Sequence, residues 1–343
     1  MRERIRLILA ALFYYCGLTK LAVWWKQHTG QHLIILNYHE AKGENLRHQL
    51  LYLRHHYRIM HLEEALEEFY ASPEEQRRRR KGDRRTPLVL TFDDGYLDNY
   101  TYGLQLAREL QVPFTVFLIP GYTESGACFW WLAADYLVNH TTLDKVTIEG
   151  QTYHLAQPAE RNALAQAITT HVRNASTVAQ REAFLADIQQ ALAVSLPTRA
   201  VEDLNDLSLP VTWEEIREME QSGWVSFGAH TMHHPILAYL SDPIEAQYEL
   251  VECRRVLEQQ LGHPIRTFAY PVGKLRHIGD QGLKAVKVAG YQWALTTIEE
   301  VNTPQTDPHQ LNRLPGDIAL NWMVMAAELA GLLGILSRLR KKA

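Results

Sequence analysis

The sequence predicts an α/β protein whose parallel strands form an incomplete barrel of the βα type. Short β-branched or aromatic runs alternate with amphipathic helical stretches, and this alternation is typical of a parallel sheet with helical crossovers. With 343 residues, 46% of them apolar, the chain can bury a large core, so disordered and fibrous architectures are excluded. Polar side chains follow several of the expected strands, as at the rim of a catalytic barrel.

Seven short runs are expected as strands, and amphipathic stretches between them are expected as helices. The strands are 33–38, 88–92, 114–119, 224–229, 267–271, 293–297 and 311–314. The helices are roughly 45–70, 97–110, 212–222, 242–261 and 279–289. Thr212 and Ser241 are the expected N-caps of two of these helices.

A basic run at residues 77–85 interrupts the alternation within the segment 71–87. Because like charges repel one another, this segment is expected to be a solvated loop. Contact with an anionic polymer or a lipid headgroup is the alternative.

A second interruption, residues 128–210, is expected to be a mainly helical insertion that covers one mouth of the barrel. A hairpin is expected around Glu149, followed by an alanine-rich helical region. Trp130, Trp131 and Tyr136 are expected to pack within the insertion, and stacking on a sugar ring is the alternative.

Charge and cysteine content exclude several classes of partner. Lys plus Arg is 35 against 39 for Asp plus Glu, a net charge of -4, so no basic field favours nucleic acid. The 3 cysteines are widely spaced, which fits neither a disulfide framework nor a cysteine zinc site.

Both ends of the chain are apolar and flanked by basic residues. Leu7–Leu18 follows three arginines without a small-x-small cleavage site, and the mostly apolar 322–336 precedes a basic tail at 338–342. Packing against the main domain, lying in a membrane interface and acting as a signal anchor are the three alternatives. Peripheral membrane association and a cytoplasmic location both remain open.

Histidines and carboxylates gather after the expected strands. His39 follows the first, Asp93 and Asp94 the second, and the segment 230–234 (HTMHH) the fourth. Because strand ends meet at one rim, these groups are expected to converge and to bind a divalent metal.

The metal ligands are expected to be His230, His234 and one aspartate. A separation of four residues points two imidazoles in one direction on a helical turn, which Pro235 would end. Two imidazoles and a carboxylate leave positions open for water, which is the catalytic arrangement for zinc. Repulsion between the adjacent Asp93 and Asp94 is relieved if one binds metal and the other accepts a proton or faces a cation.

Three motifs make the sequence recognisable: TFDDGY at 91–96, HTxxHP at 230–235 and FAYPxG at 268–273. Together they resemble the NodB-like polysaccharide deacetylases, carbohydrate esterase family 4, over residues 33–127 and 211–315. The resemblance implies a deformed (β/α)7 barrel that removes N-acetyl groups from amino sugars with a divalent metal, for which zinc is favoured.

The same resemblance assigns roles by position. Asp93 would be the general base, and Asp94, His230 and His234 the metal ligands, whereas His233 lies at a variable position. The Tyr38-His39 pair resembles the branch that includes poly-N-acetylglucosamine deacetylases, in which a histidine there replaces a late general acid.

The chain departs from the family pattern at two places. It has Ala269 where many members have an arginine, and it lacks the late LxxH motif. His39 is therefore the expected general acid, with His309 as the alternative. Arg313, at the end of the last strand, is expected to replace the missing positive charge and keep Asp93 ionised.

The expected reaction is attack by a metal-bound water on the amide, with Asp93 taking the proton of the water. A backbone N–H in the segment Tyr270, Pro271, Val272 and Gly273 would stabilise the oxyanion, with Val272 preferred. The alternatives are a deacylase or deformylase of a lipid-linked sugar, and a catalytically dead barrel that only binds glycan.

The expected organisation has four parts. An apolar N-terminal helix (1–30) precedes a deacetylase barrel (31–127 and 211–318), with an insertion or lid (128–210) and an amphipathic C-terminal helix with its basic tail (319–343). The expected partners are an N-acetylated glycan or lipid-linked sugar and, peripherally, a membrane.

Overall fold

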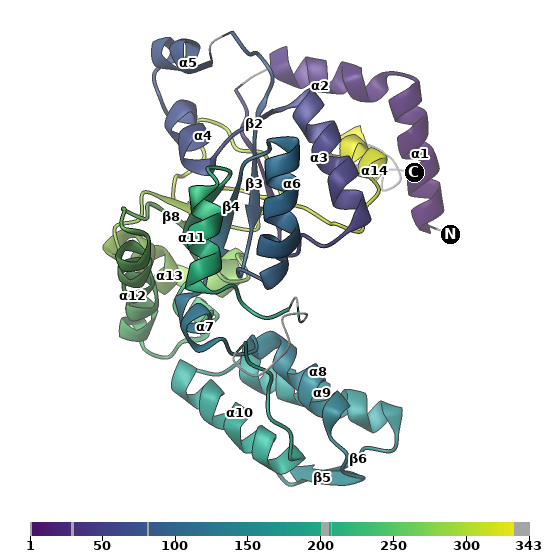
Figure 1. Cartoon of the computed structure of the whole chain (residues 1–343), viewed down its shortest axis with the longest axis vertical. Coiled ribbons are helices and arrows are strands. Elements are labelled where there is room, and N and C mark those ends of the chain that lie inside the picture. Colours follow the sequence, from purple (N-terminus) through teal and green to yellow (C-terminus); the bar gives the residue numbers. More distant parts are fainter. Residues whose placement is uncertain (1, 29–30, 81, 200–205, 207, 333–343) are drawn as a thin grey trace.

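A curved sheet of parallel strands forms the centre of the molecule (Figure 1). The computed structural model describes residues 2–28, 31–80, 82–199, 206 and 208–332. The sheet has the order β10-β1-β3-β4-β7-β8-β9, and the short β2 pairs with β3 beside it. Its strands are β1 (Ile34–Tyr38), β2 (Arg58–Ile59), β3 (Pro87–Phe92), β4 (Phe114–Leu118), β7 (Val225–Ala229), β8 (Thr267–Ala269), β9 (Trp293–Leu295) and β10 (Leu314–Pro315).

The last segment of the barrel joins the two edges of this sheet. Leu311 pairs with Leu295 of β9, and three residues later Leu314 pairs with Leu36 of β1. The predicted α/β barrel with a mainly helical insertion is therefore confirmed. The expected strand at 311–314 is displaced, because this segment crosses from one neighbour to the other and pairs with each only briefly.

Helices cover the outside of the sheet, as the alternating pattern predicts. They are α3 (Glu44–His56), α4 (Leu62–Phe69), the π-helix η1 (Asn99–Leu104), α6 (Gln105–Leu110), α7 (Pro120–Ser125), α11 (Trp213–Gln221), the 3-10 turn η2 (Leu237–Tyr239), α12 (Pro243–Leu261) and α13 (Leu275–Val288). Thr212 caps α11 in a capping box, as expected, whereas Asp242 rather than Ser241 caps α12.

Two helix boundaries differ from the prediction for local reasons. The expected helix 45–70 is broken at Tyr57, where the chain becomes extended and forms β2 before α4 begins. The expected helix 279–289 begins earlier, at Leu275, because two helical segments meet across a kink at Gly279.

The basic segment 71–87 is not entirely a loop, and the solvated-loop prediction is wrong for residues 73–80. This stretch is an exposed helix, α5 (Pro73–Arg80), with no buried residue. Acidic residues compensate its positive charge, since Arg79 pairs with both Glu75 and Glu67 and Arg80 pairs with Glu68. An interaction at i, i+4 and contacts to α4 therefore hold a helix that like-charge repulsion alone would disfavour.

The inner face of the barrel is apolar at the end where the strands begin. Alternate residues of neighbouring strands, such as Ile35 and Val89, pack there with Phe117. Helix α4 closes this end, because Leu66 and Phe69 belong to the same buried cluster. Only the opposite end, where the strands finish, is left for a site.

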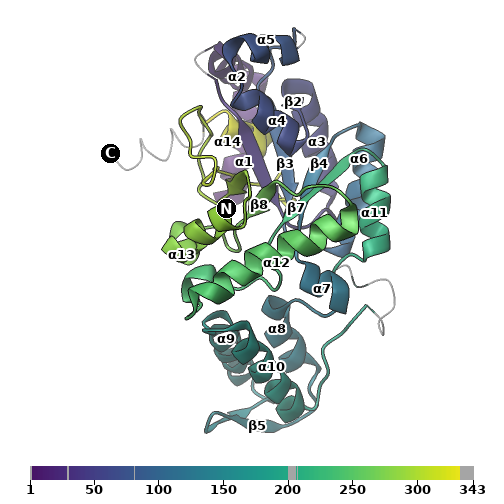
Figure 2. The same ribbon diagram turned by 90° about the vertical axis from the view of Figure 1, so that its left-hand side faces the viewer.

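The insertion lies at that opposite end. It contains α8 (Trp130–His140), the antiparallel strands β5 (Lys145–Ile148) and β6 (Gln151–His154), α9 (Pro158–Arg173) and α10 (Val178–Leu192). The expected hairpin is confirmed, and the helices form a separate buried cluster. Figures 1 and 2 both show this layer beyond α7, on the far side of the molecule from α2 and α5.

The N-terminal helices α1 (Arg2–Tyr15) and α2 (Leu18–His28) lie beside α14 (Trp322–Leu329) (Figure 1). Ala10 of α1 is buried against Val324 and Ala327 of α14, and Tyr14 meets the Trp322 ring edge-on at 4.9 Å. Within the described residues no single helix is long and apolar enough to cross a membrane. The pair Arg4–Tyr15 and Leu18–Trp25 meets that criterion jointly but is bent by 72°. The basic tail at 338–342 lies outside the described residues.

Candidate active site

The inner face of the barrel turns from apolar to polar where the strands end. Along β1, Ile35 is followed two residues later by Asn37. Along β3, Val89 is followed two residues later by Thr91, and Asp93 comes next on the same side. Arg313 reaches this face from the segment before β10 and is 1% exposed. The alternation of the strands therefore places an ion pair above the apolar floor.

Arg313 binds Asp93 through both carboxylate oxygens. Its Nη1 donates to Oδ1 at 2.7 Å and its Nη2 to Oδ2 at 2.9 Å. Further donation to the Thr296 carbonyl and the Asn37 side chain fixes the guanidinium. Burial alone would raise the pKa of Asp93, but the charge and hydrogen bonds of Arg313, together with the neighbouring imidazoles, outweigh burial and hold that pKa well below its usual range.

Asp94, His230 and His234 converge beside this ion pair. The Nε2 atoms of His230 and His234 lie 3.5 and 3.7 Å from Oδ1 of Asp94, and all three residues are buried. One ligand atom from each residue lies within 4.8 Å of the others. Among the described residues, this is the group of histidine, cysteine and acidic side chains that could hold a metal ion.

The donor atoms present fit a metal ion. Oδ1 of Asp94 is buried and accepts no hydrogen bond, although it faces two imidazoles. His230 Nδ1 lies 2.7 Å from the Ala269 carbonyl oxygen, which requires the proton on Nδ1 and leaves the Nε2 lone pair facing Asp94. Burial, together with the neighbouring His230, lowers the pKa of His234 to about 3, so this imidazole is a neutral ligand.

The two imidazoles converge for a different reason from the helical turn that the sequence suggested. Residues 230–234 are not helical, and Thr231 and His234 both have left-handed backbone angles, φ 67° and 55°. The Thr231 hydroxyl accepts a hydrogen bond from His234 N–H at 2.9 Å and closes the loop. The expected convergence is present, but a strained loop produces it.

Backbone strain is concentrated at this rim. Asp94 and Val272 also have positive φ, 75° and 60°, which a β-branched residue such as Val272 rarely adopts. Position 95 has room only for glycine, because a Cβ there would lie 2.8 Å from a side-chain carbon of Leu118. Strain of this kind persists where the surrounding structure enforces it, and it is common at functional sites.

Side chains outside the motifs hold the metal-binding loop. Glu249 of α12, 1% exposed, accepts hydrogen bonds from His233 N–H at 2.8 Å and from its ring Nδ1 at 2.7 Å. From the insertion, Arg181 donates to the His233 carbonyl at 2.9 Å and Trp130 to the His234 carbonyl at 3.0 Å. His233 thus points away from Asp94, His230 and His234, and the insertion is fastened to the loop that carries the two converging imidazoles.

A cavity of about 700 Å³ opens above these residues. The expected general acid His39 is exposed on its wall, beside Tyr38 and Glu40. The insertion contributes another part of the lining, through Trp130, Trp131, Thr169 and Arg173. The cavity therefore has an imidazole from the barrel and aromatic and polar side chains from the helices of the insertion.

The four residues of the segment 270–273 differ in whether they line the cavity. Val272 lines the cavity, its carbonyl accepts from the Thr297 hydroxyl at 2.8 Å, and within the described residues its N–H has no hydrogen-bond partner. Tyr270 is fully buried, and its hydroxyl donates to the His309 carbonyl. Gly273 packs so tightly on Thr297 that a Cβ would lie 2.7 Å away. Pro271 precedes Val272 and does not line the cavity.

His309, the alternative general acid, does not line the cavity. Its ring Nε2 lies 3.0 Å from the Tyr291 carbonyl oxygen, and its backbone N–H donates to Asp307. Only His39 of the two candidates therefore faces the metal-binding residues.

A second hollow continues from the cavity along α9. It has a volume of about 610 Å³ and shares Thr169 and Arg173 with the first. Its remaining lining is rich in amide, hydroxyl and aromatic side chains, including Asn162, Gln166 and Tyr239. The two hollows together form a groove over the insertion.

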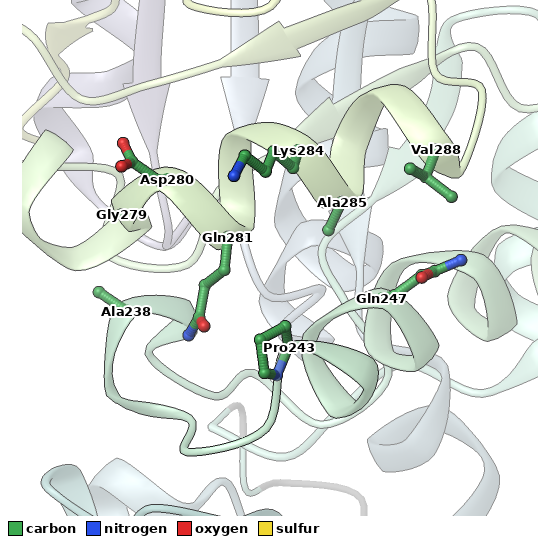
Figure 3. Close-up of a pocket in the computed structure, with 9 residues that line it drawn as sticks. All are labelled: Ala238, Pro243, Gln247, Gly279, Asp280, Gln281, Lys284, Ala285 and Val288. Carbon is green, nitrogen blue, oxygen red and sulfur yellow. The ribbon is translucent and has the colours of Figure 1, made fainter.

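A further cavity of about 450 Å³ lies between α12 and α13, apart from the metal-binding residues (Figure 3). Asp280 is the carboxylate among its lining residues, and Gln281 donates to the Leu240 carbonyl at 3.0 Å. It has no imidazole or thiol lining and offers no comparable chemistry.

Sequence reasoning missed several residues of the site. Asn37 could have been noticed, because it is a polar residue in an otherwise apolar strand. Glu249 and Arg181 gave no signal, since each lies in a helix whose packing alone brings it to the loop. Packing within the insertion was the preferred prediction for Trp131. Its ring does stack on Phe129, and it also lines the cavity.

Comparison with known proteins identifies relatives. The family described as Polysaccharide deacetylase matches residues 80–294. Over 87 residues the chain is 31% identical to YxkH of Bacillus subtilis (strain 168), whose name carries the same family description. The aligned part is 25% of this chain and 29% of YxkH, so less than a third of that relative is matched.

Solved structures share the fold. The Streptococcus pyogenes deacetylase PplD in complex with acetate superposes with a TM-score of 0.51 at 18% identity, covering 87% of this chain and 97% of PplD. IcaB from Ammonifex degensii gives 0.52 at 18% identity with the same coverages. The BpsB deacetylase domain from Bordetella bronchiseptica gives 0.51 at 16%, covering 84% and 97%.

Proposed function

Because the chain belongs to the polysaccharide deacetylase family, we propose that it hydrolyses N-acetyl groups from amino sugars of a polysaccharide or oligosaccharide. The observation that carries the proposal is the position of the Asp93–Arg313 pair beside Asp94, His230 and His234 on the floor of one cavity. Water activation and amide polarisation are both needed at one point, and this floor offers groups for both.

Asp94, His230 and His234 would hold a divalent metal, for which zinc is our proposal. Two imidazole nitrogens and one carboxylate oxygen are a common catalytic zinc set. When bound, the ion would lower the pKa of a coordinated water and polarise the substrate carbonyl. The hydrogen bond from His230 to the Ala269 carbonyl would keep that imidazole oriented toward the ion.

Asp93 would act as the general base. Arg313 uses one acceptor position on each carboxylate oxygen, so a further lone pair on each remains for the proton of the attacking water. The lowered pKa keeps Asp93 ionised throughout the physiological range, so its carboxylate carries no proton when the water attacks.

His39 and Val272 would complete the reaction. The water oxygen bonds to the acetyl carbon while the carbonyl oxygen gains charge, and the N–H of Val272 can donate to that oxygen. Breaking the C–N bond then requires a proton on the sugar nitrogen, which His39 would donate from the cavity wall. The products are acetate and a free amino sugar.

The groove over the insertion supports a substrate of several sugar units. Trp131 presents an indole to the cavity, and an aromatic face is suited to stacking on a sugar ring. Arg173 is exposed in both hollows and forms no hydrogen bond or ion pair within the described residues. These groups would contact sugar units that flank the one being deacetylated.

A lipid-linked sugar is the second candidate substrate, and it is favoured by the exposed apolar side chains of α1 and α2. Hydrolysis of a formyl or acetyl group from such a molecule would use the same floor residues. The active enzyme and the lipid-linked alternative both need Asp93, whereas a barrel that only binds glycan does not.

Incubation of the metal-loaded protein with N-acetylated oligosaccharides and with lipid-linked sugars tests the proposal. Released acetate and the mass of the product should reveal loss of acetyl groups from the oligosaccharides. Asp93→Asn protein, which keeps the shape of the side chain, should release acetate about 10²–10⁴-fold more slowly. Equal release by both proteins, or release from lipid-linked sugars alone, contradicts the proposed polysaccharide activity.

A further inference from the structure

The N-terminal helices expose an unusual number of large apolar side chains. Of the 17 such residues exposed in the described part of the chain, 8 lie between Ile5 and Trp25. We call them the apolar ridge: Ile5, Ile8, Leu12, Tyr15, Leu18, Leu21, Trp24 and Trp25. Ile8 is 67% and Trp25 62% exposed, so these two residues have most of their surface in contact with solvent.

The ridge residues of α1 lie along one face of that helix, and α2 exposes four more: Leu18, Leu21, Trp24 and Trp25. Ile5, Ile8, Leu12 and Tyr15 recur at intervals of three and four residues, which places them along one side of a helix. The other side of α1 already has a partner, because Ala10 is buried against α14. Both faces of α1 are therefore apolar, and α14 can cover only one of them.

The charge near the ridge identifies its partner. Residues 1–28 carry five basic residues and one acidic residue, although the whole chain has a net charge of -4. An apolar face with a concentration of positive charge is complementary to a lipid surface that carries negative charge.

We propose that the apolar ridge docks on the surface of an anionic lipid bilayer, with α1 and α2 lying in the interface. Neither helix can cross alone, since 14 and 11 residues are fewer than the about 20 that a span requires. The two helices meet at 72° around Gly17, whose left-handed φ of 75° makes the corner. Trp24 and Trp25 are the residue type that is enriched at the boundary between lipid and water.

Flotation of the purified full-length protein with vesicles tests the proposal independently of its enzymatic activity. The vesicles are phosphatidylcholine alone, or phosphatidylcholine with phosphatidylglycerol as about a third of the lipid. The protein should float with the anionic vesicles, and salt at about 1 M, which screens charge beyond about 3 Å, should reduce the bound fraction. Alkaline carbonate should release the remainder.

The double variant Ile8→Gln/Leu12→Gln should lower the apparent affinity for anionic vesicles by about 100-fold, because each lost apolar contact costs about a factor of ten. Both positions are exposed, so folding should be unaffected, and thermal unfolding checks this. The matched control is Ile244→Gln on α12, which removes an equally exposed isoleucine, 73%, away from the ridge and should bind like the unmodified protein.

Five results would overturn the proposal. The first three are failure of the unmodified protein to float with anionic vesicles, unchanged binding by the double variant, and equal loss in the Ile244→Gln control. Retention through the carbonate wash would indicate a spanning anchor instead. A dimer that dissociates in the double variant, with no vesicle binding, would assign the ridge to a second copy of the chain.

Discussion

The cavity has a floor and a wall that differ in construction. On the floor, Asp93, Asp94, His230 and His234 are each less than a tenth exposed, and strand ends or strained loops fix them. On the wall, Arg173 projects from a helix of the insertion, is exposed and has no hydrogen-bond partner among the described residues. The floor is thus organised before a substrate arrives, whereas Arg173 on the wall still has hydrogen-bond donors that a substrate could use.

This difference separates two tasks. Preorganised, buried charges are suited to stabilising a transition state, because they need little rearrangement as charge develops. Exposed groups on a helix can contact distant parts of a long substrate and affect its affinity. Changes to the floor should therefore lower turnover, and changes to the wall should alter the preference for substrate length.

The largest effect is expected from removing a metal ligand. His230→Ala should abolish stoichiometric metal binding and lower kcat/KM by about 10³-fold or more, because the ion supplies several kcal/mol of stabilisation. Metal analysis and acetate release measure the two effects. The control is His233→Ala, whose ring faces Glu249 and should leave the metal content unchanged. Loss of metal from His233→Ala with retention in His230→Ala would reverse the assignment.

The next effect is expected at the general base. Asp93→Asn should keep its metal but lower kcat by about 10²–10⁴-fold, the usual contribution of a positioned base. Metal analysis of the same preparation distinguishes this outcome from loss of the ion. Near-normal turnover in a metal-loaded variant would remove Asp93 from the mechanism.

The sequence predicted the floor far better than the wall. Asp94, His230 and His234 are recognisable because each follows a strand whose apolar pattern is clear, and strand ends meet at one rim. Arg313 was expected beside Asp93 from its position at the end of the last predicted strand, and it lies there, although the segment that carries it crosses between two neighbouring strands before β10.

What the sequence did not predict depends on packing between distant helices. Glu249 reaches the metal-binding loop only because α12 packs beside it, and Arg173 faces the cavity only because the insertion folds back over the rim. Helix α5 was missed because its charge is balanced by Glu67 and Glu68 of a different helix. No local pattern encodes these contacts.

A smaller effect than at Asp93 is expected at the general acid. His39→Ala should lower kcat by about 100-fold without changing metal content, because the ring is exposed on the cavity wall and holds no other group. His309→Ala is the matched control, since its ring binds a backbone carbonyl outside the cavity. Equal loss in both variants would show that neither acts specifically.

On the wall, Arg173→Gln should raise KM for long oligosaccharides by about tenfold, the value of one charged hydrogen bond, and leave kcat for the shortest substrate unchanged. Steady-state kinetics over a series of chain lengths measures this. Arg255→Gln on α12, an exposed arginine 58% accessible, is the control. A uniform loss at every length would make Arg173 a structural residue.

The smallest effect is expected at the His233–Glu249 contact that supports the loop. Burial lowers the pKa of His233, but the hydrogen bond that its ring donates to Glu249 and the negative charge of Glu249 together outweigh burial and raise the pKa above its ordinary value. The stabilisation is therefore complete below the unfolded-state pKa and is lost as pH rises through the folded-state pKa. Denaturant unfolding of the unmodified protein and of Glu249→Gln, measured from about pH 5 to 9, checks this. The difference in free energy of unfolding between the two proteins should shrink as the pH rises, by about 1 kcal/mol or less, since the imidazole is partly exposed.

We propose that one ion on the floor of the cavity drives deacetylation. Protein stripped of metal with a chelator is titrated with Zn²⁺, while bound zinc and acetate release from an N-acetylated oligosaccharide are measured together. Activity should rise in proportion to bound zinc and reach its plateau at about one ion per chain. Full activity in the stripped protein, or zinc bound at that stoichiometry without acetate release, would contradict it.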